Sequence, residues 1–346
     1  MIRQYKLTRF PDPRPFLHIR CGDDILDKLA EAGIPGDRIR WADVLCEGPL
    51  HHHSSDQHRQ KERAAYISAR YGIPLSETYR EIKGEDQRVD QCVNYDETVL
   101  WFEADLFDQA ILVYLLARLS GMAEQAKLSL ICIGSFPGVR RFIGLGQLSP
   151  AQLATLLPLR ERVTTAQFEL ARETWEAFNA PDPIALSHVS LSRSSILPFL
   201  PAAVRRYLAE YPSTRNGLSQ TEQWALEAVA RGAKTPAGAF GRVQRREPRP
   251  FMGDSMFYAV IRGLAQGEEP ALEGEHPRFA SLRDPELRRC PVRLTATGRK
   301  LLLGKADWCR LSGFARSIGG VHFRGAEPRW RWDAERRQIV EHRPRL

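Results

Sequence analysis

The first part of the chain alternates short apolar runs with segments of helical period. PFLHIR, DRIRWADVL, ETVLWF and KLSLICIG each predict a strand. DDILDKLAEAG predicts a helix that stops at Gly33, and LFDQAILVYLLARLSG a strongly amphipathic helix that stops at Gly121. Strands that alternate with helices are typical of an open parallel sheet. We therefore expect a Rossmann-like α/β domain over residues 1–148.

Helical period replaces this alternation further along the chain. SPAQL predicts a helix that begins at Pro150, and TTAQFELARETWEAFNA and LPFLPAAVRRYLAEYPS predict two more. We interpret residues 149–215 as a helical connector. The insertion from residue 51 to about 95 is polar, and there RQKERAAYISARYG predicts a helix that ends at Gly72, with loop or short helix after it.

Residues 216–346 predict a winged-helix-like α+β domain. Ser219 and Glu222 form a capping-box pattern before the first helix, and TPAGAFGRVQRR predicts the second. SMFYAVIRGLAQG predicts a third helix, capped by Asp254. ALEGE and VRLTATGRKLLLG then predict a two-stranded wing that runs into a helix. The tail PRWRWDAERRQIV predicts a closing hairpin with Trp330 and Trp332 in the core.

The composition favours a folded chain of two or three domains. Of its 346 residues, 43% are hydrophobic and 27% are charged, values close to those of average globular proteins. It has no apolar run of eighteen residues and no signal peptide, which indicates a cytoplasmic protein without a membrane span. The six cysteines include no C-x-x-C pair, so reduced thiols are favoured over disulfides or a zinc ribbon.

The net charge of +8 permits contact with a polyanion, and its distribution points to the C-terminal part. There, basic residues of a wing and its neighbouring helices would neutralise nucleic-acid phosphates. An arginine-rich run is also often a solvated face, and winged helices also bind proteins. The candidates for nucleic-acid contact are Arg242, Arg245, Arg246, Arg293, Arg299 and Lys300.

Carboxylates follow three of the four predicted strands. Ligands of open parallel sheets bind outside the carboxyl ends of the strands, so these positions predict a ligand site. If two carboxylates meet there, one pKa must rise or a cation must lie between them. The catalytic candidates are Asp24, Asp43, Glu103, Asp105 and Asp108, and the cofactor-binding candidates are Gly22, Asp23, Glu47 and Gln109.

Two interpretations of these carboxylates stay open. Asp24, Asp43 and Asp105 would suit a hard divalent ion, Mg²⁺ or Mn²⁺, because such ions prefer oxygen ligands. Alternatively, several of them only cap helix N-termini.

Other candidate motifs are weaker. HHHSSDQH contains His51, His52, His53 and His58 near Glu47, which could bind a transition metal or act as acid and base, but the stretch has no metal-binding spacing and a polar loop is favoured. We expect His18 to be a hydrogen-bonded core residue. FIGLGQL lacks the third glycine of a dinucleotide fingerprint, and the chain has no P-loop and no nucleophile elbow. Familiar NTPases and serine hydrolases are therefore disfavoured.

HIRCGDD, WADVLCEGPL and LWFEADLFDQAILVYLLARL together resemble a bacterial family known as domain of unknown function 1835. FIGLGQLSP, GLSQTEQWALEAVARG and GGVHFRGAEPRWRWD resemble the long form of that family. The resemblance implies a Rossmann-like N-terminal region and a helical C-terminal region, and it supplies no activity. It also implies a histidine in the third strand's exit, where this chain has Ala104.

Two classes of function follow. The first is a ligand-sensing α/β domain coupled to a winged-helix module that binds nucleic acid or protein. The second is a metal-assisted hydrolase or transferase that acts on a phosphorylated or nucleotide-like substrate at the acidic sheet edge. We favour the first, because no catalytic motif is complete whereas the order of three helices and a wing is. The sequence does not indicate an oligomeric state.

Overall fold

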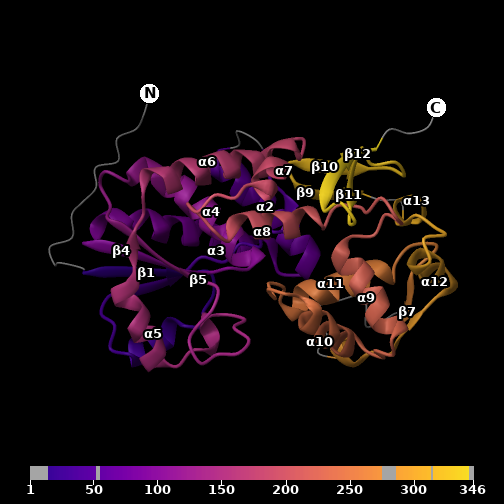
Figure 1. Cartoon of the computed structure of the whole chain (residues 1–346), viewed down its shortest axis with the longest axis horizontal. Helices are drawn as coiled ribbons and strands as arrows, with labels where there is room; N and C mark the ends of the chain where they lie inside the picture. Colours follow the sequence, from indigo (N-terminus) through magenta and orange to yellow (C-terminus); the bar gives the residue numbers. More distant parts are fainter. Residues whose placement is uncertain (1–14, 52–54, 275–285, 313–314, 343–346) are drawn as a thin grey trace. The chain divides into compact units, whose positions relative to one another are not determined.

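The computed structural model describes residues 15–51, 55–274, 286–312 and 315–342. The chain forms two compact units. Figure 1 shows the whole chain. The first unit comprises Met1–Asp43, Ile82–Glu103 and Ile111–Arg172, and the second comprises Val44–Glu81, Ala104–Ala110 and Glu173–Leu346. The ranges of these two units alternate along the sequence. The division into domains at 1–148, 149–215 and 216–346 stays a prediction.

A five-stranded sheet forms the centre of the first unit. Its strand order is β2-β1-β4-β5-β6, in which the first four strands are parallel and β6 is antiparallel to β5. The four parallel strands are the four that the apolar runs predict, so the expected α/β class is confirmed. The bounds are β1 (Phe16–Arg20), β2 (Asp37–Arg40), β4 (Glu97–Glu103), β5 (Leu128–Ile133) and β6 (Glu161–Arg162).

Helices α1 (Leu26–Glu31) and α5 (Pro150–Leu156) cover one face of this sheet. Their apolar residues form one buried cluster with Val99, Trp101 and Ile131. The sheet core also holds His18, whose Nδ1 accepts a hydrogen bond from Trp101 Nε1 at 3.1 Å and whose Nε2 bonds to Pro35 O at 3.0 Å. His18 is fully buried, so it is the hydrogen-bonded core residue that the sequence predicts.

Helix α3 (Leu75–Val89) corrects the prediction of loop or short helix after Gly72. Part of its buried face is polar, which hides the hydrophobic period. Glu85 accepts hydrogen bonds from Arg40 Nε at 3.1 Å and from the Ala42 N–H at 2.9 Å. Asp86 accepts from Trp41 Nε1 at 3.0 Å. These carboxylates replace the apolar contacts that would mark the helix in the sequence.

Helix α4 (Leu106–Leu119) begins where predicted but is not amphipathic. Nearly all of its residues are buried, including Asp108, Gln109 and the run from Ala110 to Leu116. A helix that is apolar on all sides belongs in the interior of a protein.

The second unit contains three small sheets. β3 (Gly48–Pro49) pairs in parallel with β9 (Ala315–Gly319), which pairs antiparallel with β10 (Val321–Arg324). β7 (Leu272–Gly274) and β8 (Val292–Leu294) form the predicted two-stranded element, and β11 (Trp330–Asp333) and β12 (Gln338–Glu341) form the predicted closing hairpin. Trp330 and Trp332 are buried, as expected for core residues.

Helices of the second unit pack around a separate apolar core in which Phe257, Ile261 and Leu301 are buried. The Ser219–Glu222 capping box is present. Asp254 was predicted to cap α11 (Asp254–Leu264), but it is the first residue of that helix and Gly253 is the N-cap. Asp254 Oδ1 accepts a hydrogen bond from the adjacent Ser255 N–H. The helices of this unit are α2 (Asp56–Tyr71), α7 (Ile184–Leu191), α8 (Leu200–Leu208), α9 (Gln220–Ala230), α10 (Pro236–Arg246), α11 (Asp254–Leu264), α12 (Ala296–Leu302) and α13 (Trp308–Leu311).

The three helices predicted within residues 149–215 are present as α5, α6 (Thr165–Asn179) and α8, and α6 continues from the first unit into the second. Short 3₁₀ helices are η1 (Asp90–Asn94), η2 (Ser120–Met122), η3 (Leu145–Gln147), η4 (Leu157–Leu159) and η6 (Leu287–Arg289). Within the described ranges, no helix has the length and apolar character needed to cross a membrane.

Candidate functional site

Two of the predicted strand-end carboxylates meet at one arginine. Arg20, the last residue of β1, donates from Nη2 to Glu103 Oε1 at 2.5 Å and from Nε to Asp24 Oδ1 at 3.0 Å. Arg20 and Glu103 are each 4% exposed. The cation that two neighbouring carboxylates need is therefore this guanidinium.

A loop of the same unit lies against these carboxylates. The Leu145 N–H donates to Glu103 Oε1 at 2.6 Å. A Cβ at Gly144 would lie 2.7 Å from Glu103 Oε2, and one at Gly146 would lie 2.8 Å from Asp24 Oδ2. The glycines of FIGLGQL thus allow the loop to approach the sheet edge closely. Backbone of this chain occupies the position next to Asp24 and Glu103 where a ligand was predicted.

The other strand-end candidates lie in both units, and in the second unit one carboxylate oxygen of Asp105 lies within 4.8 Å of one of Asp108. Asp23 pairs with Arg40 at 3.1 Å, and Asp43 is buried in the first unit near Glu85. Asp105 Oδ1 accepts the N–H groups of Phe107 and Asp108 at 2.8 and 3.1 Å, the geometry of a helix cap. Capping is therefore observed for Asp105. The remaining candidates are Gly22 in the first unit and Glu47, Asp108 and Gln109 in the second.

Glu47 was predicted at the end of the second strand of the sheet, but it lies elsewhere. It does not follow a strand of the five-stranded sheet, because β3 starts at the next residue and pairs with β9. This places Glu47 in the wall of a cavity of about 670 Å³ within the second unit. We call this cavity the charged pocket. Its lining includes three arginines and four glutamates, namely Arg70, Arg316, Arg324, Glu47, Glu62, Glu210 and Glu222.

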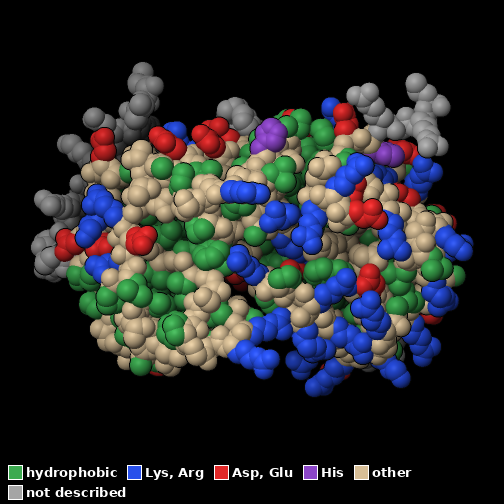
Figure 2. All heavy atoms as spheres, viewed as in Figure 1, with side chains coloured by type: hydrophobic (Ala, Val, Ile, Leu, Met, Phe, Trp, Pro, Cys, Tyr) green, Lys and Arg blue, Asp and Glu red, His purple; other side chains and the backbone are tan. Residues whose placement is uncertain are grey.

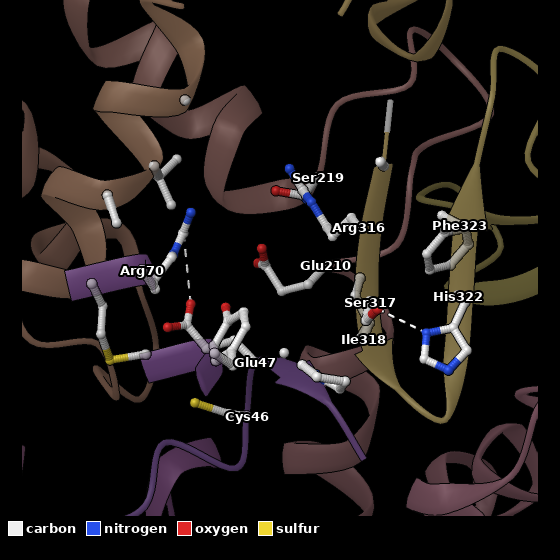
Figure 3. Close-up of a pocket in the computed structure, with 18 of the residues that line it drawn as sticks. Cys46, Glu47, Arg70, Glu210, Ser219, Arg316, Ser317, Ile318, His322 and Phe323 are labelled. Atoms are coloured by element: carbon white, nitrogen blue, oxygen red, sulfur yellow. Dashed lines mark hydrogen bonds and ion pairs between the residues drawn. The ribbon is translucent and has the colours of Figure 1, made fainter. Parts of the chain in front are cut away.

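Figure 3 shows how the side chains of the charged pocket lie. Arg70, Glu210 and Arg316 point toward the same space from α2, from the segment after α8 and from β9. The volume falls in the range of small-molecule sites, about 300–1,000 Å³. An apolar wall completes the pocket, formed by Phe251, Met252, Met256 and Val260. The pocket thus combines charged groups with an apolar surface, as binding sites do.

Most carboxylates of the pocket already have protein partners. Glu222 accepts the Ser219 N–H at 2.7 Å in the capping box and also pairs with Arg316. Glu210 accepts from Arg206 Nη1 and from the Thr221 hydroxyl, both at 2.5 Å. Burial alone would raise the pKa of Glu210, but Arg206 outweighs it and lowers the pKa. Both acids are therefore paired within the protein, Glu210 with Arg206 and Glu222 with Arg316.

Arg70 is less completely paired. Its Nη2 lies 3.7 Å from Glu47 Oε2, which is too long for a hydrogen bond. Its Nε is buried and has no hydrogen-bond partner among the described residues. Burial alone would lower the pKa of Arg70, yet Glu47 and the nearby tyrosines hold it above its usual value. Arg70 thus brings a guanidinium to the wall of the charged pocket, and its contact with Glu47 is longer than a hydrogen bond.

A second arginine, Arg316, lines the same pocket. Burial alone would lower the pKa of Arg316, whereas Glu222 raises it above its usual value. The charge of Arg70 lowers the pKa of Arg316, because the two cations repel each other. An anion between the two guanidinium groups would relieve this repulsion.

The predicted nucleic-acid residues lie on the surface of the second unit. Arg242, Arg245 and Arg246 are exposed on α10, Arg293 on β8, and Arg299 and Lys300 on α12. Figure 2 shows Lys and Arg side chains gathered at the lower right, where Figure 1 places α10. Residues 231–249 contain six basic residues and one acid, Glu247, which is buried against Arg206.

No protein-family model and no curated protein matches the chain. The resemblance to domain of unknown function 1835 therefore stays a prediction, and the site's chemistry must indicate the function.

Sequence reasoning missed the arginines of the charged pocket. Arg70 and Arg316 lie in segments without a known motif. One signal was present: the Gly319-Gly320 pair between ARSI and VHFR is a hairpin pattern that predicts β9 and β10. That hairpin would have placed Arg316 on a strand. It gives no indication that Arg70 of α2 lies near it.

Proposed function

We propose that the protein binds a small anionic ligand, a carboxylate or a phosphate monoester, in the charged pocket. The observation that supports this is the pair of arginines in the pocket wall, Arg70 and Arg316, with Arg70 Nη2 beyond hydrogen-bond distance of Glu47 at 3.7 Å. Guanidinium groups bind carboxylates and phosphates through paired N–H donors. Arg70 and Arg316 would hold the anionic group, and the apolar part of the ligand would contact Met252, Met256 and Val260.

The ligand site of this proposal replaces the one predicted at the sheet edge. Asp24 and Glu103 bind Arg20 there, so they give no support to a metal-assisted hydrolase or transferase. In contrast, α11 lines the charged pocket and packs on α10, with the Phe257 and Phe240 rings 5.5 Å apart. A ligand in the pocket would therefore touch the helix that supports the basic surface, which suits a ligand sensor.

Thermal unfolding with inorganic phosphate or hexanoate as probe tests the pocket. A hundredfold excess over Kd should stabilise the protein by about 2.7 kcal/mol. Arg70→Met should abolish this gain, since it removes the donors while Glu47 keeps its hydrogen bond from Tyr71. A larger gain with hexanoate would identify a carboxylate ligand, and a larger gain with phosphate would identify a phosphate monoester.

Arg80→Met, an exposed change on α3, is the matched control and should leave the gain intact. Equal stabilisation of the wild-type and Arg70→Met proteins would show that the anions act on the surface in general, and it would refute the proposal. Absence of any gain with both probes would refute it as well.

A second function is supported by the basic surface. We propose that the second unit contacts nucleic-acid phosphates through α10, β8 and α12. The third helix, α11, does not have the exposed basic face of a recognition helix, because Met256, Phe257, Tyr258 and Ala259 are buried. Contact through the second helix and the two-stranded element is the arrangement that this surface favours.

Binding of duplex DNA, followed by fluorescence anisotropy, should weaken steeply as salt rises. The double change Arg293→Gln and Lys300→Gln removes two exposed charges and should reduce the slope of log K against log salt by about 1.8, since each phosphate contact contributes about 0.9. Lys83→Gln with Arg162→Gln removes the same charge from exposed positions of the first unit and should leave the slope unchanged. Equal slopes for both double variants would contradict contact through β8 and α12.

A further inference from the structure

Three elements of the second unit bring histidines and a carboxylate together beside the charged pocket. His51 follows β3, His58 and Glu62 lie on α2, and His322 lies on β10. One ligand atom from each of His51, His58 and Glu62 lies within 4.8 Å of the others. His58 and Glu62 are four residues apart on a helix, so they share one face. His51 Nδ1 contacts Glu62 Oε1.

His322 extends this group. Its ring centroid is 5.0 Å from that of His51, whose ring is 5.9 Å from that of His58. The dashed line in Figure 3 marks the 2.8 Å hydrogen bond between His322 Nδ1 and the Ser317 hydroxyl. This bond orients the imidazole and leaves Nε2 for another partner. Ligating histidines in metal sites are held in this way through their second nitrogen.

A carboxylate oxygen in the cluster also lacks a partner. Glu62 Oε2 is buried and accepts no hydrogen bond from any described residue. A buried carboxylate oxygen without a donor costs free energy unless a cation lies nearby. Glu62 also lines the charged pocket, together with Ser317 and His322. Two of the four side chains, Glu62 and His322, thus belong to the pocket wall.

We propose that His51, His58, Glu62 and His322 form a binding site for a divalent transition-metal ion of the Zn²⁺ class. Imidazole and carboxylate are the ligands that Zn²⁺ takes, at about 2.0–2.2 Å. Adjacent ligand atoms of a tetrahedral site are about 3.3 Å apart. Side-chain rotations that bring the atoms closer would therefore complete the site, and His58 is exposed and free to make them.

The chemistry of this site differs from the Mg²⁺ or Mn²⁺ site predicted at the sheet edge. Nitrogen donors favour Zn²⁺, Co²⁺ and Ni²⁺ over the hard ions. The inference does not depend on the anion proposed for Arg70, because it involves other residues and other donors.

Isothermal titration of the full chain with ZnCl₂ alone tests the site. We expect one Zn²⁺ per chain, and we expect His58→Ala and Glu62→Gln each to weaken binding by at least about tenfold, since even loss of an orienting partner costs 10–100-fold. Co²⁺ should bind in competition with Zn²⁺ and give the visible absorption of a low-coordinate site. Ser317→Ala should weaken binding less than His322→Ala does.

Two controls keep the outcome clear. His188→Ala changes an exposed histidine on α7 and should leave binding unchanged. The double change His52→Ala and His53→Ala affects histidines that lie outside the described residues and should leave one strong site. If that double variant alone lost the metal, or if His58→Ala and Glu62→Gln bound Zn²⁺ like the wild type, the four-residue site would be refuted.

Discussion

Arg20→Met should destabilise the first unit by about 3–5 kcal/mol, the cost of removing one partner from a buried ion pair. The methionine fills much of the same volume but supplies no charge. Glu103, which is 4% exposed, would then lose its guanidinium donor while it keeps the Leu145 N–H, and Asp24 would lose the same guanidinium. The penalty is large because the interior does not solvate the remaining carboxylate.

Urea unfolding combined with hydrogen exchange of the β1 and β4 amides measures this loss. Arg38→Met on β2 is the control: its guanidinium donates to the Ile34 carbonyl at 2.6 Å, and removing one such bond should cost about 1 kcal/mol. Adding Glu103→Gln to Arg20→Met should recover part of the stability, since it removes the uncompensated charge. Equal losses of stability in Arg20→Met and Arg38→Met would show that Arg20 and Glu103 are not coupled. Strictly additive effects of Arg20→Met and Glu103→Gln would show the same.

Gly319→Ala should destabilise the second unit by about 2–4 kcal/mol, combining overpacking with the strain of a positive φ. Gly319 ends β9 with a φ of +59°, a conformation that L residues rarely adopt. A Cβ there would lie 2.3 Å from the Phe178 carbonyl oxygen and 2.7 Å from the Tyr207 hydroxyl. Since the first neighbour is backbone, the contact cannot be relieved by a side-chain rotation.

Gly325→Ala separates the two contributions. Gly325 also has a positive φ, +80°, but a Cβ there would have no heavy atom within 4 Å. It should therefore cost only about 1 kcal/mol, the low end for a strained backbone conformation. The two variants can be compared by thermal unfolding. A Gly319→Ala protein as stable as Gly325→Ala would mean that Phe178 and Tyr207 move aside freely.

The sequence predicts the first unit well because its sheet follows local patterns. Each parallel strand is a short apolar run, and each is recognisable without knowledge of its neighbours. Helix α3 was missed because Glu85 and Asp86 occupy its buried face, and their partners Arg40 and Trp41 lie on a distant segment. Helix α4 was interpreted as amphipathic because burial of Asp108 and Gln109 is not visible in a local pattern.

The site was harder to predict for the same physical reason. Asp24 and Glu103, two of the candidate carboxylates, both accept hydrogen bonds from Arg20, which looked like an ordinary strand residue in the sequence. The charged pocket draws its residues from segments around 47, 66, 210, 256 and 318. No spacing rule connects these segments, since packing alone brings them together.

The pairing of β3 with β9 affects the order in which the second unit can form. Gly48 pairs with Ile318, so one of the earliest strands of the chain has its partner among the last. During synthesis the first unit has all of its residues once Arg172 has left the ribosome, whereas Glu47 and Arg70 must wait for Arg316. Contacts between such distant segments carry a large loop-closure entropy and form slowly. The charged pocket is therefore among the last parts of this protein to form, and until then the residues around β3 are open to non-native pairing.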